Sequence, residues 1–260
     1  MTMNMKEKDL IERLVKQAGD ALMKHFRQDW ALLKERGTAK EVATKYDKEV
    51  DTLIVTEIER HCPGHSLLTE ESGLFQGDPD WLWIVDSLDG TGNFANFNPL
   101  FSVCIALMHK SELLLGAIYA PAIDEFYFAE KGKGAYLNGM KIEISDVSDL
   151  SQSYILYCEG GDKNKVRTGE LLHEVYPHVT DIRKLGSAGL ETAWVAAAKR
   201  DAYFTTKIEP WDVAPGVLLV QEAGGRVSDF QGNPWKPQTS DLLFSSDKLH
   251  KGILHLLSSR

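Results

Sequence analysis

Apolar residues recur near every 3.6 positions along the first part of the chain, which is typical of amphipathic helices. Residues 6–35 carry Leu10, Leu14 and Leu22 on one side of such a helix, with polar residues between them. The same spacing returns over residues 44–60, after a break at a glycine. The pattern therefore predicts two long helices, each with one apolar face to bury.

The middle of the chain changes to short apolar runs separated by Gly, Pro, Asp and Asn, a pattern typical of strands joined by tight turns. The predicted strands cover residues 81–86, 100–108, 113–119, 125–129 and 134–137. Because most of the connections are short, neighbouring strands are expected to pair in chain order as a meander.

Beyond residue 150, predicted strands and helices alternate. The strands cover residues 153–158, 181–185, 202–206 and 226–229, and the helices cover 165–176, 188–199, 213–223 and the segment after Ser246. Helices before a meander, followed by an alternating half, predict an α+β fold of stacked helix and sheet layers. We expect one domain of residues 1–260, in which a turn at 145–151 separates a lobe of residues 1–147 from a lobe of residues 148–260.

Composition places the chain among globular proteins and narrows its partners. Of its 260 residues, 43% are hydrophobic and 26% are charged, and the net charge is −9. Such a chain lacks the clustered basic face that nucleic-acid binding requires, and no run approaches the roughly 20 apolar residues of a membrane span. The polar first residues do not resemble a signal peptide, and three widely spaced cysteines give neither a disulfide framework nor a zinc site. We therefore expect a cytoplasmic protein.

Two aspartates stand directly after the apolar run 81–85. Asp86 and Asp89 are three residues apart, and Gly90 and Thr91 follow them. Carboxylates that leave a strand end together can converge on a hard cation such as Mg²⁺, and glycine lets the backbone approach a phosphate. The same residues also fit a polar turn in which Asp89 caps a helix, so the spacing alone leaves both interpretations open.

Three further acidic sites are weak signals when each is taken alone. Glu70 and Glu71 follow a short apolar pair and fit a solvated turn as well as a metal site. Asp212 opens a predicted helix, where an aspartate N-cap is common. Asp47 ends a loose capping box that begins at Thr44. Taken together, their order along the chain is more informative.

The order and separations of these four sites resemble the inositol monophosphatase family of lithium-sensitive, magnesium-dependent phosphomonoesterases. The family signature W-I-V-D-P-I-D-G-T-T-N-F corresponds to residues 83–94, and G-E-E-S corresponds to 69–72. The family's W-D-x-A and E-A-G-G blocks correspond to 211–214 and 222–225. The resemblance covers nearly the whole chain. It implies a homodimer with the layered α-β-α-β-α sandwich of the inositol monophosphatase and fructose-1,6-bisphosphatase type.

The resemblance also implies roles for individual residues. Two or three Mg²⁺ ions would be bound by Glu70, Asp86, the Leu88 carbonyl, Asp89 and Asp212. Asp47 and Thr91 match the pair that orients and deprotonates the attacking water, and Glu70 is a further catalytic position. The residues implied in binding the phosphate and the rest of the substrate are Asp89, Gly90, Thr91, Gly186, Ser187, Ala188, Thr205, Lys207 and Asp212. Bound Mg²⁺ would also reconcile an acidic protein with an anionic substrate.

Several positions depart from the family pattern without removing a ligand. Ser87 replaces a proline and is expected to loosen the turn between the two metal aspartates, and Gly92 and Thr69 replace a threonine and a glycine. Thr205 stands where inositol-specific members carry a glutamate, and a hydroxyl cannot accept two strong hydrogen bonds from a diol as a carboxylate does. Lys207, close by, could meet a second anionic group. We therefore expect broad specificity that extends to bisphosphates.

The expected activity is Mg²⁺-dependent hydrolysis of a small phosphate monoester by metal-activated water, with inositol 1-phosphate as the first candidate. The enzymatic alternatives are fructose-1,6-bisphosphatase, histidinol-phosphatase and 3′-phosphoadenosine 5′-phosphate phosphatase. The nucleotide enzymes usually carry K-E-F after D-G-T, whereas residues 92–94 are Gly-Asn-Phe, which disfavours the last activity. The non-enzymatic alternative is a regulatory binding protein that keeps the fold, and the complete ligand set counts against it.

Overall fold

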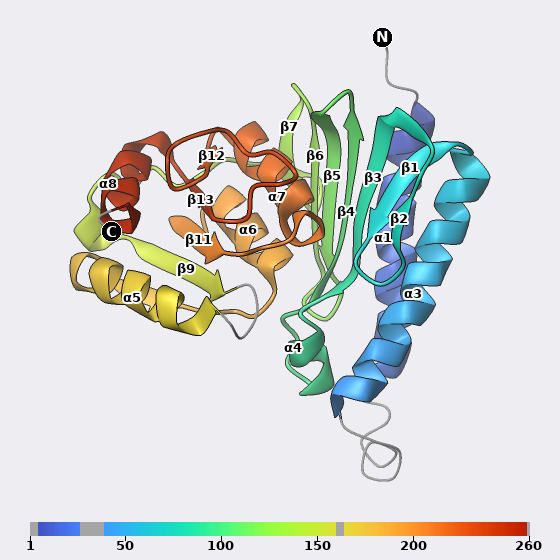
Figure 1. Cartoon of the computed structure of the whole chain (residues 1–260), viewed down its shortest axis with the longest axis horizontal. Coiled ribbons are helices and arrows are strands. Elements are labelled where there is room, and N and C mark those ends of the chain that lie inside the picture. The colour runs from blue at the N-terminus through green and yellow to red at the C-terminus, as the bar shows by residue number, and fades with distance from the viewer. Residues whose placement is uncertain (1–4, 27–38, 160–163, 259–260) are drawn as a thin grey trace.

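The computed structural model of the chain describes residues 5–26, 39–159 and 164–258 (Figure 1). Its helices are α1 (Met5–His25), α3 (Ala39–His61), α4 (Thr91–Ala95), α5 (Lys165–Val175), α6 (Ala188–Ala196), α7 (Pro210–Glu222) and α8 (Asp247–Leu257), with 3₁₀ turns η1 (Leu150–Gln152) and η3 (Tyr176–His178). Helix α3 starts before its predicted beginning, so residues 44–47 lie inside a helix and the capping-box interpretation is wrong. The predicted continuation of the first helix over 27–35 lies outside the described residues.

One sheet has eight strands in the order β2-β1-β3-β4-β5-β6-β7-β8. They are β1 (His65–Thr69), β2 (Gly73–Phe75), β3 (Asp78–Asp89), β4 (Ser102–His109), β5 (Glu112–Ala120), β6 (Glu125–Glu130), β7 (Gly134–Leu137) and β8 (Met140–Ile142). β1 runs parallel to β3, and the other neighbouring pairs are antiparallel. The predicted meander is therefore confirmed from β3 to β7.

The other sheet has five strands in the order β10-β9-β11-β13-β12. They are β9 (Tyr154–Glu159), β10 (Asp181–Arg183), β11 (Ala202–Thr206), β12 (Arg226–Ser228) and β13 (Leu242–Ser245). β9, β10 and β11 are mutually parallel, so their carboxyl ends meet at one edge. β13 was not predicted, because a four-residue apolar run shows no periodicity. It is antiparallel to both of its neighbours.

The two sheets and three helix pairs form five layers. Helices α1 and α3 cover one face of the eight-stranded sheet, α6 and α7 lie between the sheets, and α5 and α8 cover the outer face of the five-stranded sheet (Figure 1). The predicted α-β-α-β-α sandwich is confirmed. In the sequence, the strands of one sheet precede the predicted turn at 145–151 and those of the other sheet follow it. In the fold, one apolar core that includes α6 and α7 joins the two sheets. The division into two lobes stays a prediction.

The middle layer packs at backbone distance. A Cβ added at Gly216 of α7 would lie 1.8 Å from the Thr192 hydroxyl of α6, and one added at Gly116 of β5 would lie 2.8 Å from the Pro215 carbonyl. Only glycine allows these approaches. At the far end of α7, the Glu222 carboxylate accepts the N–H groups of Gly132 and Gly134 at 2.7 and 2.8 Å. The E-A-G-G block thus fixes α7 to the turn between β6 and β7.

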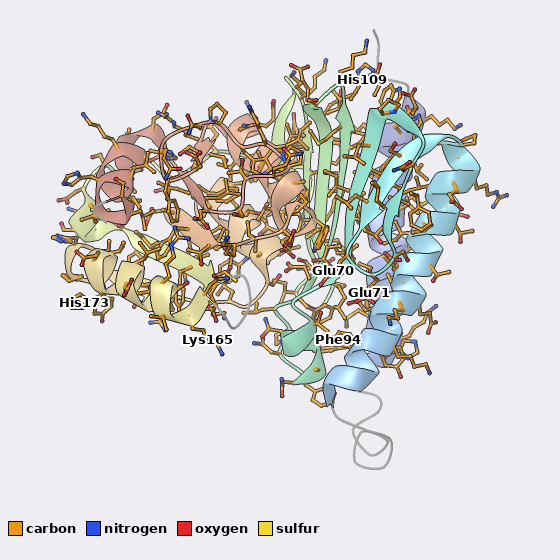
Figure 2. The ribbon with its side chains drawn as sticks, in the orientation of Figure 1. Glu70, Glu71, Phe94, His109, Lys165 and His173 are labelled. Atoms are coloured by element: carbon orange, nitrogen blue, oxygen red, sulfur yellow. The ribbon has the colours of Figure 1, made fainter. Side chains whose placement is uncertain are left out.

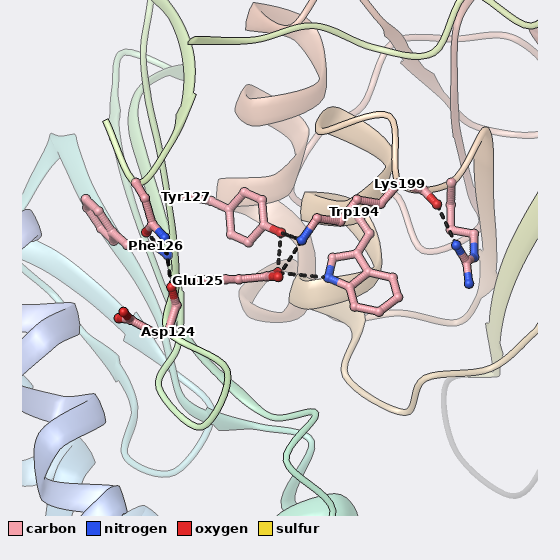
Figure 3. Close-up of polar contacts among 8 residues, drawn as sticks. Asp124, Glu125, Phe126, Tyr127, Trp194 and Lys199 are labelled. Atoms are coloured by element: carbon pink, nitrogen blue, oxygen red, sulfur yellow. Dashed lines mark hydrogen bonds and ion pairs between the residues drawn. The ribbon is translucent and has the colours of Figure 1, made fainter. Parts of the chain in front are cut away.

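A polar cluster joins β6 to the end of α6 (Figure 3). The Glu125 carboxylate accepts hydrogen bonds from the Tyr127 hydroxyl at 2.5 Å and from the Trp194 indole N–H at 3.2 Å. Lys199 forms an ion pair with Glu125 and donates to the Tyr127 oxygen at 3.2 Å. Burial, followed by the hydrogen bond to Glu125, raises the pKa of Tyr127, so its hydroxyl stays protonated as a donor. The cluster thus joins the first half of the chain to the second half.

His250 of α8 is a buried imidazole held between two serines. Its Nε2 and Nδ1 atoms lie 2.8 Å from the hydroxyls of Ser228 and Ser245, respectively. Burial, followed by the nearby Arg226 charge, lowers the pKa of His250 from 6.5 to about 4. The folded chain therefore keeps a neutral imidazole at pH values where the unfolded chain binds a proton.

This difference predicts a pH-dependent stability. The contribution of neutral His250 is present above pH 6.5 and is lost as the pH falls towards about 4, because only the unfolded chain takes up the proton. We expect the free energy of unfolding of the wild-type protein to fall more steeply over this range than that of His250→Gln. The difference in slope should approach about 1.4 kcal/mol per pH unit, measured by urea unfolding.

The matched control is His173→Gln, which changes an exposed histidine of α5. It should keep the wild-type slope. Equal slopes for His250→Gln and the wild-type protein would contradict the assignment.

Candidate metal and phosphate site

An extra residue in β3 brings its two aspartates to one face of the sheet. Asp86 pairs with Cys104 and Asp89 pairs with Ser102, so three steps along β3 match two steps along β4. Without this bulge, side chains three residues apart would point to opposite faces. Both carboxylates therefore face the α6 and α7 layer. The strand continues to Asp89 and the cap of α4 is Gly90, so the prediction that Asp89 could cap a helix is wrong.

Glu70 and Asp212 reach Asp86 from two other elements. β1 is parallel to β3, with Thr69 opposite Val85, so Glu70 follows β1 at the same sheet edge as Asp86. Figure 2 shows Glu70 at the end of the sheet near α4, away from His109 at the other end. Asp212 comes from the first turn of α7. Carboxylate oxygens of Glu70, Asp86 and Asp212 lie within 4.8 Å of one another.

The alternative interpretation of Asp212 as the N-cap of its helix is wrong. Helix α7 begins at Pro210, and Glu209 is the cap. The Asp212 carboxylate accepts the Glu209 N–H at 3.1 Å through Oδ2. In the same way, Asp86 accepts the Leu88 N–H at 3.0 Å through Oδ1. One oxygen of each aspartate is thus oriented by the backbone, and the other remains available to a cation.

Asp89 is surrounded by donors from β4 and the start of α6. Its Oδ1 accepts the Ala188 N–H at 2.8 Å, and its Oδ2 accepts the Gly189 N–H at 3.0 Å. Oδ2 also accepts the Ser102 hydroxyl at 2.7 Å and the Ser187 hydroxyl. Asp89 is therefore tied to the second half of the chain, across the interface between β3 and α6. Its charge raises the pKa values of Glu70, Asp86 and Asp212, so it lies beside these three carboxylates.

The carboxylates are crowded in a buried place. Burial, followed by the charges of Glu70 and Asp89, raises the pKa of Asp86 well above its ordinary value. Burial, followed by the charges of Asp89 and Glu70, does the same for Asp212. Burial and the Asp89 charge raise the pKa of Glu70 to about 7. A divalent cation at this position would offset the repulsion among the ionised groups.

Asp47 approaches the site from α3, on the other side of β3. It is 2% exposed, and its Oδ1 accepts the Ser87 hydroxyl at 2.6 Å. Burial raises the pKa of Asp47 to about 8 against the lowering effect of this hydrogen bond. The expectation that Ser87 only loosens the turn is therefore incomplete, because its side chain holds the predicted catalytic aspartate. The hydroxyl of the other predicted catalytic residue, Thr91, donates to the Leu88 carbonyl at 3.1 Å.

The turn at 186–188 lies against the end of β3. A Cβ added at Gly90 would lie 3.1 Å from the Gly186 carbonyl and 3.2 Å from the Ser187 Cβ. Gly90 has φ +88° and Gly186 has φ +83°, values that favour glycine. The structure thus brings the predicted substrate-binding turn to the end of β3, beside Asp89.

The two predicted specificity residues lie at the end of β11 in different environments. Thr205 is fully buried, and its hydroxyl has no hydrogen-bond partner among the described residues. Lys207 is exposed with φ +57°, and its N–H binds the Asp241 carboxylate at 3.0 Å. Its ammonium group forms no ion pair within the described part of the chain. Lys207 is therefore the more accessible of the two to a substrate.

The sequence pattern did not predict the hydrogen-bond donors that surround the carboxylates. Ser102 and Asn93 lie in segments without a charged signal, and their hydrogen-bond partners lie 13 and 92 positions away along the chain. Asn93 donates to the carbonyls of Leu100 and Leu185, at 2.5 and 2.8 Å. The asparagine in the G-N-F segment was the available signal, but its partner lies 92 positions away.

The close approach at Gly189 predicts a substitution effect. A Cβ there would lie 2.2 Å from the Cys104 sulfur and 3.0 Å from Asp89 Oδ2. Gly189→Ala should lower the free energy of unfolding by about 1–3 kcal/mol and reduce activity, because Cys104 and Asp89 must both shift. Cys104→Ala in the same chain should restore part of both losses, because it removes the closer of the two contacts. Thermal unfolding and phosphate-release assays measure them.

Gly169→Ala is the control, because no atom lies within 4 Å of a Cβ at that position in α5. It should leave activity unchanged. A Gly189→Ala protein with wild-type stability and activity, or one that Cys104→Ala does not improve, would show that the site tolerates displacement here.

Comparison with known proteins agrees with this geometry. The model of the inositol monophosphatase family matches residues 6–260. The chain is 35% identical to the fructose-1,6-bisphosphatase/inositol-1-monophosphatase of Thermotoga maritima, covering 96% of this chain and 95% of that protein. It is 33% identical to the Nus factor SuhB of Escherichia coli, covering 93% and 92%. The inositol monophosphatase structure from Anabaena (Nostoc) superposes with a TM-score of 0.88 at 31% identity, covering 98% and 96%. The chain therefore belongs to the inositol monophosphatase family and is a phosphoric monoester hydrolase.

Proposed function

We propose that this chain hydrolyses a small phosphate monoester with Mg²⁺ as cofactor, and that inositol 1-phosphate is its preferred substrate. The observation that carries this proposal is the convergence of Glu70, Asp86 and Asp212 from three elements to within 4.8 Å. Carboxylate oxygens are the ligands that Mg²⁺ prefers. The donor set fits because the backbone orients one oxygen of Asp86 and one of Asp212, which leaves their other oxygens for the ion.

In this proposal, Glu70, Asp86 and Asp212 hold the ions, with Asp89 and the Leu88 carbonyl beside them. Bound Mg²⁺ would lower the pKa of a water molecule, neutralise charge on the phosphoryl group and stabilise the leaving oxygen. In this proposal, Asp47 and Thr91 orient the attacking water, and the ionised Asp47 carboxylate accepts its proton. The hydrogen bond from Ser87 supports this role, because it fixes the Asp47 side chain. No side-chain nucleophile is required.

Gly90, Thr91 and the turn 186–188 bind the phosphate and the adjoining part of the substrate. Their support is the contact between Gly90 and Gly186, together with positive φ angles at both glycines. The alternative substrate is fructose 1,6-bisphosphate, and the Thermotoga maritima relative carries both activities in its name. Histidinol phosphate and 3′-phosphoadenosine 5′-phosphate remain further alternatives.

We also propose a lithium-sensitive, cytoplasmic homodimer. Family membership supports the lithium sensitivity and the homodimer. Among the described residues, no helix is both long enough and apolar enough to cross a bilayer. The Escherichia coli relative is named as a Nus factor, which keeps a regulatory role open as a second function of this fold.

Phosphate release from a substrate panel tests the proposed function. The panel contains inositol 1-phosphate, fructose 1,6-bisphosphate, histidinol phosphate and 3′-phosphoadenosine 5′-phosphate, each with and without Mg²⁺ and Li⁺. We expect Mg²⁺-dependent release that is fastest with inositol 1-phosphate and inhibited by Li⁺. Asp212→Asn should lower kcat by about 100-fold or more, because it removes charge from the metal site.

Asp212→Asn is a cleaner test than Asp89→Asn. An asparagine oxygen at 212 can still accept the Glu209 N–H. In Asp89→Asn, by contrast, the side-chain NH₂ group would face a backbone N–H group of α6, and two donors would meet. The variant should keep the wild-type Tm in EDTA. Asp146→Asn changes an exposed aspartate and is the control. Absence of turnover on every substrate, or an active Asp212→Asn protein, would refute the proposed function.

Lys207 provides a separate test of specificity. If its ammonium group meets a second phosphate, Lys207→Ala should raise KM for fructose 1,6-bisphosphate by about tenfold and change KM for inositol 1-phosphate by less than about twofold. Lys236→Ala, at an exposed lysine elsewhere, serves as the control. Equal changes on both substrates would remove Lys207 from the specificity assignment.

A further inference from the structure

Glu191 is a fully buried carboxylate to which neither the family resemblance nor the proposed reaction assigns a role. It lies in the first turn of α6. Its Oε1 atom accepts the N–H groups of Leu185 and Gly186, at 2.7 and 3.1 Å, so one oxygen binds two consecutive amides of the turn before the helix. Burial raises the pKa of Glu191 to about 8 against the lowering effect of these two bonds. Burial thus favours the neutral form, which can still accept both N–H groups through Oε1.

The turn that Glu191 holds is also held from the opposite side. The Asn93 amide donates to the Leu185 carbonyl at 2.8 Å, and a Cβ at Gly186 would lie 3.2 Å from that same amide. The Gly186 carbonyl in turn lies against Gly90 at the end of β3. The turn is thus confined between a carboxyl group on α6 and the segment that follows the metal aspartates.

The residues that bind Asp89 follow this turn directly. The Ser187 hydroxyl and the N–H groups of Ala188 and Gly189 supply three of the four hydrogen bonds to the Asp89 carboxylate. They stand within four residues of the amides that Glu191 holds. Because the backbone is continuous here, a shift of the turn would displace all three donors together.

We propose that Glu191 is a positioning residue, which fixes the turn at 185–186 so that the start of α6 holds the Asp89 carboxylate in the one orientation that serves the metal site. The inference rests on the proposed function, since it gives Asp89 its task beside the ion. Glu191 itself touches neither the substrate nor the ion. It acts through backbone amides and then through the donors on Asp89.

Two substitutions separate acceptor geometry from charge and packing. Glu191→Met keeps a long side chain in the buried space but cannot accept the two N–H groups. Glu191→Gln keeps an oxygen that can accept both, and it resembles the neutral form of the native side chain. Glu143→Met replaces an exposed glutamate and is the matched control.

Three measurements are made on each protein. They are amide hydrogen exchange over 185–190 in metal-free protein, Mn²⁺ affinity by electron paramagnetic resonance, and kcat and KM for inositol 1-phosphate with Mg²⁺. In Glu191→Met, we expect exchange of this segment to rise and Mn²⁺ affinity to fall, each by about tenfold, with a lower kcat. Glu191→Gln and Glu143→Met should stay within about twofold of the wild-type protein.

Unchanged exchange and Mn²⁺ affinity in Glu191→Met would overturn the inference, as would a loss in Glu191→Gln as large as that in Glu191→Met. If Glu191→Met does not fold, the inference is tested by hydrogen exchange at the amides of Leu185 and Gly186 in the wild-type and Glu191→Gln proteins. Slow exchange in both the wild-type and Glu191→Gln proteins supports the inference, and unprotected amides refute it. A wild-type protein that binds no Mn²⁺ would instead refute the proposed function, so the two failures are distinguishable.

Discussion

The candidate site depends on one extra residue in β3. The bulge between Asp86 and Asp89 turns both side chains towards the helix layer between the sheets. Asp86 then meets Glu70 from the parallel neighbour β1 and Asp212 from α7, while Asp89 meets the start of α6. With a regular strand, one aspartate would face α1 and α3 instead, and no set of three carboxylates could form together with the link to α6.

The thin middle layer makes this arrangement rigid. Gly116 and Gly216 allow α6, α7 and the eight-stranded sheet to approach at backbone distance, so the helix ends that carry Asp212 and the donors to Asp89 have little room to move. Glu222 fixes the far end of α7, and the cluster around Glu125 fixes the end of α6. Fixed dipoles and donors around a cation site reduce the reorganisation needed when charge develops on a phosphoryl group.

Much of the fold could be predicted from the sequence, because its signals are local. The strands at 134–137 and 202–206 agree with β7 and β11 in full, and the family blocks lie where three of the carboxylates converge. Element ends were less predictable: Pro210 starts α7 two residues before Asp212, and α3 starts at Ala39. Strand β13 was missed because it is short.

The orienting groups could not be predicted in the same way. The hydrogen bonds of Ser87, Ser102, Asn93 and Glu191 join residues 40, 13, 92 and 6 positions apart, and no spacing rule relates these side chains to their partners. Thr205 illustrates the limit most clearly. Its position in the sequence suggested contact with substrate, whereas its hydroxyl is buried within the fold.

Anomalous diffraction from crystals grown with Mn²⁺ in place of Mg²⁺ shows directly whether the three carboxylates bind the metal. We expect an anomalous peak between Glu70, Asp86 and Asp212, at about 2 Å from an oxygen of each. A peak at another position, with these three carboxylates free of metal in a crystal of active enzyme, would contradict the proposed metal site.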